Sequence, residues 1–193
     1  LGILLGGNLG EIGFTVAATV ASGRAPLSAR KLLLVNLMTD VVPALAVAVR
    51  PPHRRDPETL LSEGPDISLG RRLEREVAVR GMCTAAGTGV AWSIARVTGT
   101  PTRAGTIALA TLVGTQLGQT IVAARGDPLV LASAGLSMAA LVGTVQLPIV
   151  SGLFGLRPLG PVGWSIVLAT ATGATVGAAL LPPLLDRLGI WTD

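Results

Sequence analysis

The chain has 193 residues, of which half are hydrophobic and only 13% are charged, and its mean hydropathy is +0.65. Soluble domains carry about 25% charged residues, so this composition excludes an ordinary soluble domain and indicates a protein embedded in a lipid bilayer. Lysine and arginine total 15 against 11 acidic residues, but the basic residues stand between apolar runs and few aromatic rings could stack on bases, so we expect no nucleic-acid partner.

The apolar runs predict the helices in chain order. A membrane-spanning helix needs roughly 20 apolar residues, and six runs come near this length, at residues 1–21, 29–49, 77–97, 104–124, 129–150 and 162–181. We therefore predict an all-α membrane protein, a bundle of about six transmembrane helices. It divides into the first two spans (1–49), a polar loop (50–76) and a four-span C-terminal bundle (77–193).

The basic residues predict the orientation of these spans. The loop 50–76 contains six arginines, which are Arg50, Arg54, Arg55, Arg71, Arg72 and Arg75. Because basic loops stay in the cytoplasm, we expect this loop and both termini to be cytoplasmic in a multi-pass protein of the cell membrane. The bias is moderate, since the opposite loops hold Arg24, Arg30, Lys31, Arg103 and Arg157. The chain starts at an apolar Leu1, so we expect it to be part of a longer protein.

Three pairs of glycines have the GxxxG spacing that lets helix backbones approach closely in lipid. They are Gly6 and Gly10, Gly114 and Gly118, and Gly173 and Gly177. We therefore expect a tight bundle.

Two of the predicted spans contain polar side chains where a charge in the bilayer is costly and usually functional. In the first span Asn8 and Glu11 are three residues apart, and in the second Asn36, Thr39 and Asp40 occupy positions i, i+3 and i+4. Each group therefore lies on one helix face. Because a short loop joins the two spans, we expect them to be antiparallel neighbours whose polar faces meet near the bilayer midplane.

The chemistry of this constellation is all-oxygen. Pro43 has no N–H, so it leaves the carbonyl of Thr39 without its intrahelical partner and loosens the turn. Carboxylates, amides, a hydroxyl and free carbonyls suit hard cations such as Ca²⁺, Mg²⁺, Mn²⁺, Na⁺ or K⁺. Two alternatives remain open: the same side chains could hold helices together through hydrogen bonds, or they could relay protons.

The same residues carry a resemblance to a known family. The sequence LVNLMTDVVPA at 34–44 resembles the sixth transmembrane helix of the cation-pumping P-type ATPases, where VNL-x-TD-x-x-PA recurs. Asn8-Leu9-Gly10-Glu11 resembles the ion-binding stretch of the fifth helix in the calcium-pump-like branch. Six spans with a polar loop after the second are similar to helices five to ten of these pumps, so the chain resembles their C-terminal transmembrane half, in a bacterial protein.

The resemblance implies a function for the site residues. Glu11 and Asp40 would be the charged ligands, with Asn8, Asn36 and Thr39 as neutral ones. Gln116 stands where calcium pumps have a glutamate ligand, although a helix–helix hydrogen bond is an equal alternative. The chain would then be the membrane portion of an ATP-driven cation pump, contributing part of its intramembrane cation site.

The remaining pump domains would be partners of this chain, alongside the lipid bilayer. No DKTG phosphorylation motif and no TGE motif occur in the sequence. ATP and Mg²⁺ would therefore act only through the missing domains, and this segment could not hydrolyse ATP alone. The rival interpretations are an ATP-independent channel or carrier and a non-transporting helical membrane subunit or remnant.

Overall fold

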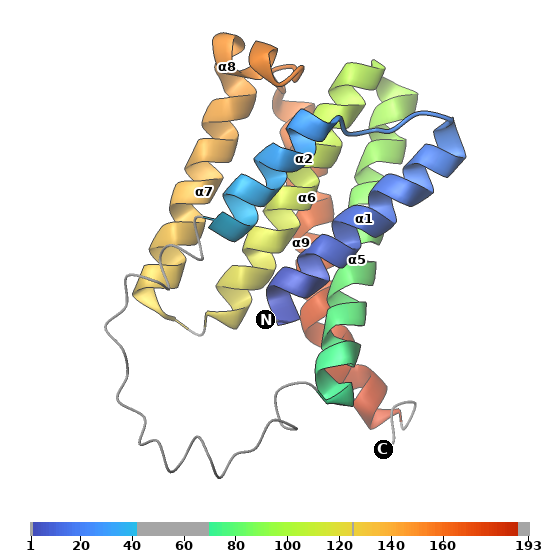
Figure 1. Cartoon of the computed structure of the whole chain (residues 1–193), viewed down its shortest axis with the longest axis vertical. Coiled ribbons are helices and arrows are strands. Elements are labelled where there is room, and N and C mark those ends of the chain that lie inside the picture. Colours follow the sequence, from blue (N-terminus) through green and yellow to red (C-terminus); the bar gives the residue numbers. More distant parts are fainter. Residues whose placement is uncertain (1, 42–69, 125, 189–193) are drawn as a thin grey trace.

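The computed structural model describes residues 2–41, 70–124 and 126–188, which form a bundle of helices (Figure 1). In chain order these are α1 (Gly2–Ser22), α2 (Ala29–Asn36), the π-helix η1 (Leu37–Val41), α5 (Arg71–Thr98), α6 (Pro101–Ala123), α7 (Pro128–Gln146), α8 (Pro148–Leu153) and α9 (Pro161–Arg187). No strand occurs in these three ranges. The predicted all-α architecture is confirmed.

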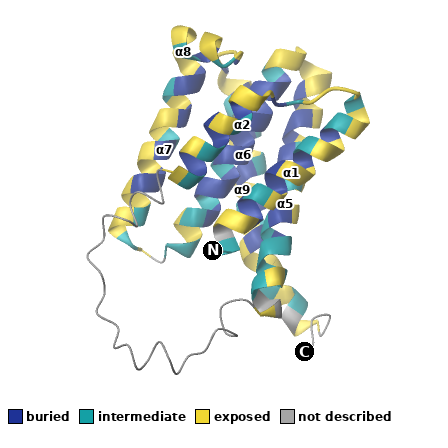
Figure 2. Ribbon diagram, in the orientation of Figure 1, coloured by how far each residue is buried: buried dark blue, intermediate teal, exposed yellow. Residues whose placement is uncertain are grey.

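Helix α6 lies at the centre of the bundle because it is apolar or small around its whole circumference. Every residue from Ala104 to Val113 is buried. A helix with this pattern is stable only when neighbours cover all its sides. It packs against α5, α7 and α9 and also contacts α1, α2 and η1, and the buried positions concentrate along it (Figure 2).

Four of the described helices are long and apolar enough to cross a membrane, at Leu4–Ser22, Pro101–Ala123, Pro128–Gln146 and Pro161–Leu185. They correspond to the first, fourth, fifth and sixth predicted spans. Helix α5 has 28 residues, but its charged first turns and its many glycines and threonines make it less apolar. Of the second predicted span only residues 29–41 are described, and 42–49 lie outside the described residues.

The fifth predicted span, 129–150, ends earlier than we expected. Helix α7 stops at Gln146, and Pro148 begins the separate helix α8. The residue before a proline is disfavoured in helical geometry, and Leu147 is accordingly extended with ψ at 115°. The side chain of Gln146 then accepts a hydrogen bond from the N–H of Leu159 at 2.9 Å and donates one to its carbonyl at 3.1 Å. This contact holds the returning chain against the end of α7.

Two other helices are longer than predicted. Helix α5 begins at Arg71, so residues 71–76 of the predicted loop are helical. An ion pair between Glu76 and Arg80 at 2.8 Å, one turn apart, supports these extra turns. Helix α9 continues to Arg187 and includes Pro182 and Pro183, where the sequence predicted an end at residue 181.

Two of the three predicted glycine pairs lie at close helix crossings. A Cβ added at Gly10 in α1 would be 2.6 Å from the Cβ of Thr84 in α5, and one added at Gly118 in α6 would be 2.6 Å from Oγ1 of Thr175 in α9. The third pair does not behave this way, because nothing lies within 4 Å of a Cβ at Gly173. That part of the packing prediction is wrong, since a spacing of four does not say which face of a helix is covered.

Replacing Gly10 by alanine should therefore destabilise the bundle by roughly 1–3 kcal/mol, because the new methyl group would overlap Thr84 and force α1 away from α5. Gly173→Ala is the matched control, since its methyl group meets open space; we expect it to be neutral or to stabilise by up to about 1 kcal/mol through helix propensity. Thermal unfolding of both variants in detergent checks this. Equal stabilities would show that the α1–α5 crossing is not tight.

Candidate functional site

The polar residues of α1 lie on its inner side. Glu11 is only 7% exposed, and Asn8 is half-buried. One turn before Glu11, Gly7 touches α6: a Cβ at this position would be 2.8 Å from Oε1 of Gln116. A glycine here lets the central helix and its amide side chain come up to the polar face of α1.

Gln116 is buried in α6 and reaches α1 directly. Its Nε2 donates a hydrogen bond to the backbone carbonyl of Gly7 at 3.3 Å. The helix–helix hydrogen bond that the sequence left as an alternative is therefore present. It also places the amide beside the residue that precedes Asn8, so the bond does not remove Gln116 from the neighbourhood of the candidate site.

The second polar group lies in a loosened stretch of helix. Residues Leu37–Val41 form the π-helix η1 directly after α2. The sequence predicted a loosened turn here from Pro43, which lies outside the described residues, but it did not predict a π-helix. Thr39 is buried, and its hydroxyl lies 3.0 Å from the carbonyl of Val35 and 3.1 Å from Oδ1 of Asp40. The Thr39 and Asp40 side chains thus form one unit.

The carbonyl of Met38 in η1 is bound by another helix. The hydroxyl of Ser137 in α7 donates a hydrogen bond to it at 2.8 Å. This bond ties η1 to α7, with which it is in contact.

The two polar groups do not pack directly against each other, contrary to our expectation. Helix α1 packs on α5 and α6, whereas η1 packs on α6 and α7, so α6 lies between them (Figure 1). The reason is the glycine face of α1, which docks α1 onto α5.

Several oxygens of this region are buried without a partner. Oδ1 of Asn8, Oε2 of Glu11 and Oδ1 of Asn36 are inaccessible to solvent and accept no hydrogen bond from any described residue. Leaving a buried acceptor unpaired costs about 1–3 kcal/mol, and more for a charged one. The predicted constellation contributes three of these oxygens; Thr15, Thr88, Thr115 and Gln119 hold the other buried side-chain oxygens without a partner among the described residues.

The donor set resembles a hard-cation site more than a transition-metal site. No group of three or more histidine, cysteine, aspartate or glutamate side chains occurs within the part of the chain that the structure describes. Two carboxylates, amide oxygens, a hydroxyl and backbone carbonyls are the ligands that alkali and alkaline-earth ions prefer.

The structure also contains buried polar residues that we did not predict. Gln119 of α6 is 1% exposed and donates from Nε2 to Oγ1 of Thr84 in α5 at 3.1 Å. Ser137, which donates to the Met38 carbonyl, was likewise missed. A signal existed for Gln119, since it stands three residues after Gln116 on nearly the same helix face; nothing in the sequence connects Ser137 with residue 38.

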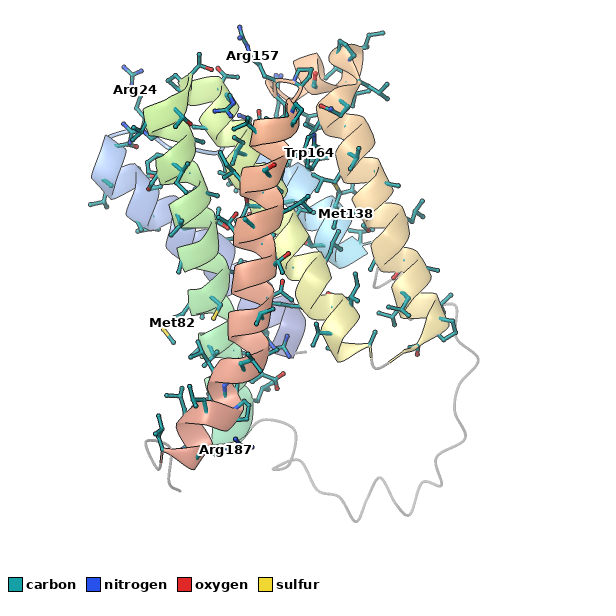
Figure 3. The ribbon with its side chains drawn as sticks, turned by 180° about the vertical axis from the view of Figure 1, so that it is seen from behind. Arg24, Met82, Met138, Arg157, Trp164 and Arg187 are labelled. Atoms are coloured by element: carbon teal, nitrogen blue, oxygen red, sulfur yellow. The ribbon has the colours of Figure 1, made fainter. Side chains whose placement is uncertain are left out.

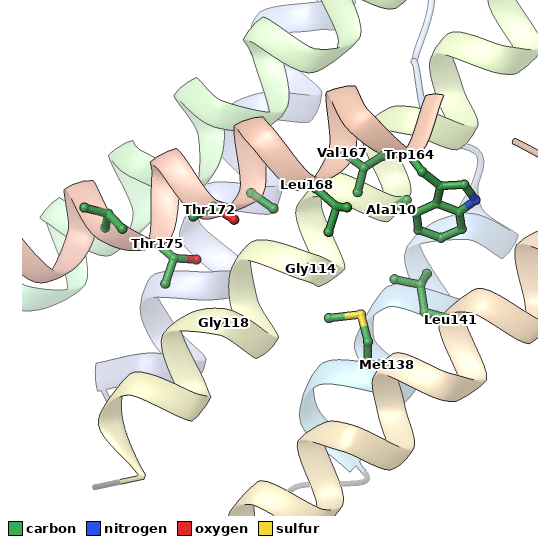
Figure 4. A pocket seen from close by; sticks show the side chains of 12 residues that line it. Ala110, Gly114, Gly118, Met138, Leu141, Trp164, Val167, Leu168, Thr172 and Thr175 are labelled. Carbon is green, nitrogen blue, oxygen red and sulfur yellow. The ribbon is translucent and has the colours of Figure 1, made fainter. Parts of the chain in front are cut away.

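An apolar groove of about 220 Å³ lies elsewhere, between α6, α7 and α9. Figure 4 shows Met138 and Trp164 on its sides and Gly114 and Gly118 along its floor. The groove contains none of the six predicted site residues, so it is separate from the candidate site.

These observations define a class of protein: a helical membrane-type bundle with acidic and amide oxygens gathered around its central helix. The family model described as "Cation transporting ATPase, C-terminus" matches residues 24–181. The chain belongs to this family, and the resemblance to the C-terminal membrane part of bacterial P-type ATPases is confirmed.

Curated relatives agree with the family. The chain is 43% identical to the "Probable cation-transporting ATPase I" of Mycobacterium leprae (strain TN), over 96% of this chain and 13% of that protein. It is 46% identical to the protein of the same description from Mycobacterium tuberculosis (strain CDC 1551 / Oshkosh), over 95% of this chain and 12% of that protein. A shorter match, 48% identical over 26% of this chain and 4% of the relative, is the "P-type sodium-transporting ATPase4" of Plasmodium falciparum (isolate 3D7). The chain thus spans about an eighth of the mycobacterial relatives.

Proposed function

We propose that this chain supplies part of the intramembrane cation-binding site of an ATP-driven pump. One observation carries the proposal: the buried oxygens of Asn8, Glu11 and Asn36 lack partners among the described residues. Oxygens that are desolvated and unpaired in the folded chain are arranged for a ligand that brings positive charge.

Each site residue has a role in this proposal. Glu11 and Asp40 supply the negative charge that attracts the cation. Asn8, Asn36 and Thr39 supply neutral oxygens from α1, α2 and η1. Gln116 holds α1 against α6 through the Gly7 carbonyl and contributes its amide oxygen when a cation is bound.

The rest of the pump completes the mechanism. Phosphorylation by ATP, with Mg²⁺, takes place in domains outside this chain, and further ligands come from helices that precede it. A hard cation is transported; Na⁺, the ion that the Plasmodium relative is named for, stands beside K⁺, Ca²⁺, Mg²⁺ and Mn²⁺. We further propose that residues 50–76 and both chain ends face the cytoplasm in the cell membrane, with residues 1–49 carrying the site and 77–193 supporting it.

Cation-dependent thermal stability tests the function. A cation that binds the folded state raises the melting temperature by an amount that grows with its concentration above Kd, about 2.7 kcal/mol at a hundredfold excess. We expect one of the five cations to stabilise the wild type and to leave Asp40→Asn unchanged. The measurement is made on the purified chain and on the full-length parent protein.

The pattern of outcomes separates the alternatives. A response confined to the parent would show that ligands outside this chain are needed. No response in either protein would contradict the proposal and favour polar helix contacts. An ATP-independent channel or carrier predicts cation flux through the parent protein without ATP.

A further inference from the structure

The excess positive charge of the chain is gathered at one end of the bundle. Five arginines that are exposed or half-buried lie at or beside the helix ends there, and we call them the cationic end: Arg24, Arg30, Arg96, Arg103 and Arg157. They come from the α1–α2 turn and the first turn of α2, the last turn of α5, the first turn of α6 and the segment before α9. Four chain segments far apart in sequence therefore contribute to one charged surface.

Contacts between these segments show that they are neighbours in space. The backbone N–H of Arg157 donates to Oγ1 of Thr106 in α6 at 3.0 Å. A Cβ at Gly105 of the same helix would be 3.1 Å from Nζ of Lys31. Figure 3 shows Arg24 and Arg157 at one end of the molecule and Arg187 at the other.

Within the part of the chain that the structure describes, the segments that form the cationic end carry no acidic residue to balance these charges. Aspartate and glutamate are absent from residues 12–39, 77–126 and 128–185, which include all five arginines. The opposite end is different: Arg80 there pairs with Glu76 at 2.8 Å. Like charges gathered without counter-charges repel each other and weaken the compact state, so an anionic partner would stabilise this surface.

The position of the surface identifies the kind of partner. The short helix α8 at the same end leaves Ile149 83% and Leu153 66% exposed. Arginines beside exposed aliphatic side chains are typical of the level where lipid headgroups meet acyl chains.

We propose that the cationic end binds the headgroups of anionic phospholipids in the adjacent membrane leaflet. The five arginines come from different helix ends, and none of them lines the apolar groove, which suits several headgroups better than one compact solute. Arginine pairs well with phosphate because its planar fork donates two parallel hydrogen bonds. This proposal is independent of the cation site, because it uses none of the same residues.

The test compares two charge-removing double variants of the full-length protein in phosphatidylcholine nanodiscs with an increasing share of phosphatidylglycerol. Native mass spectrometry counts the phosphatidylglycerol molecules that remain bound. A basic residue near an anionic surface contributes roughly 1 kcal/mol, or about fivefold. We therefore expect Arg24→Gln/Arg157→Gln to weaken phosphatidylglycerol binding roughly 30-fold at low salt, with a smaller difference at high salt.

The matched control is Arg80→Gln/Arg187→Gln, which removes the same amount of charge at the other end of the bundle. It should change phosphatidylglycerol binding less than about threefold, which is below the roughly fivefold effect of one basic residue. Arg24→Lys/Arg157→Lys should retain most of the binding. Equal binding by wild type and Arg24→Gln/Arg157→Gln would overturn the proposal. A second result would also overturn it: the wild type in pure phosphatidylcholine nanodiscs binds soluble poly-glutamate, and added phosphatidylglycerol has no effect. That result would assign the surface to an acidic polypeptide.

Discussion

Glu11→Gln should make the cation-free protein more stable while removing most of its cation affinity. In the folded chain Oε2 of Glu11 is buried without a hydrogen-bond partner among the described residues. Neutralising the side chain lowers the cost of burying it by roughly 1–3 kcal/mol. The same change removes one of two charged ligands of the proposed site. Breaking the buried ion pair between the bound cation and Glu11 costs about 3 kcal/mol, which corresponds to roughly a hundredfold loss of cation affinity.

This opposite movement of stability and binding is the signature of a ligand site. Melting temperature without added cation and the cation concentration needed for half-maximal ATPase activity are the two measurements, both on the full-length parent protein. Glu76→Gln is the control, because Glu76 is a partly exposed carboxylate paired with Arg80 at the end of the bundle; it should affect neither by more than about 1 kcal/mol. If Glu11→Gln lowered stability and left cation activation intact, Glu11 would be a structural contact.

Gln116→Leu should weaken cation binding roughly tenfold, whereas Gln119→Leu should not. Both changes delete one interhelical hydrogen bond of α6, from Gln116 to the Gly7 carbonyl in α1 and from Gln119 to Thr84 in α5. We expect similar destabilisation, about 0.5–1.5 kcal/mol, because each variant loses one buried hydrogen bond. Only Gln116 adjoins the segment that carries Asn8, so only its loss should reach the cation.

The comparison uses the same two readouts, melting temperature and cation activation of ATP hydrolysis. Because the two variants lose the same chemical group from neighbouring turns of one helix, general weakening of the bundle cancels between them. Equal tenfold losses of affinity would mean that the effect passes through packing of α6. No loss in either would restrict Gln116 to holding α1 and α6 together.

Much of the candidate site was predictable because helical spacing decides which residues share a face. The group of Asn36, Thr39 and Asp40, and the pair of Asn8 and Glu11, follow from offsets of three and four residues. The absent N–H of Pro43 predicted a loosened turn in this helix, but the π-helix at 37–41 was seen only in the structure. The motif at 34–44 pointed to the family, and the family match agrees.

Local patterns were weaker where a helix boundary depended on a single residue. Pro148 ended α7 inside an apolar run that otherwise reads as one span, whereas Pro182 and Pro183 did not end α9. Apolar length alone does not distinguish these cases, because a proline can be accommodated where neighbouring groups relieve its lost hydrogen bond.

The sequence by itself determined the all-α class, the family, the faces of α1 and η1 that carry oxygens, and the close crossing at Gly10. Only the tertiary structure decided that α6 separates the two polar groups, that Ser137 donates to the Met38 carbonyl, and that basic residues from four segments form one cationic end. The physical reason is that periodicity fixes directions around a single helix axis, whereas the choice of neighbour is made by packing of the whole bundle. Which surfaces meet therefore depends on side chains that are distant along the chain.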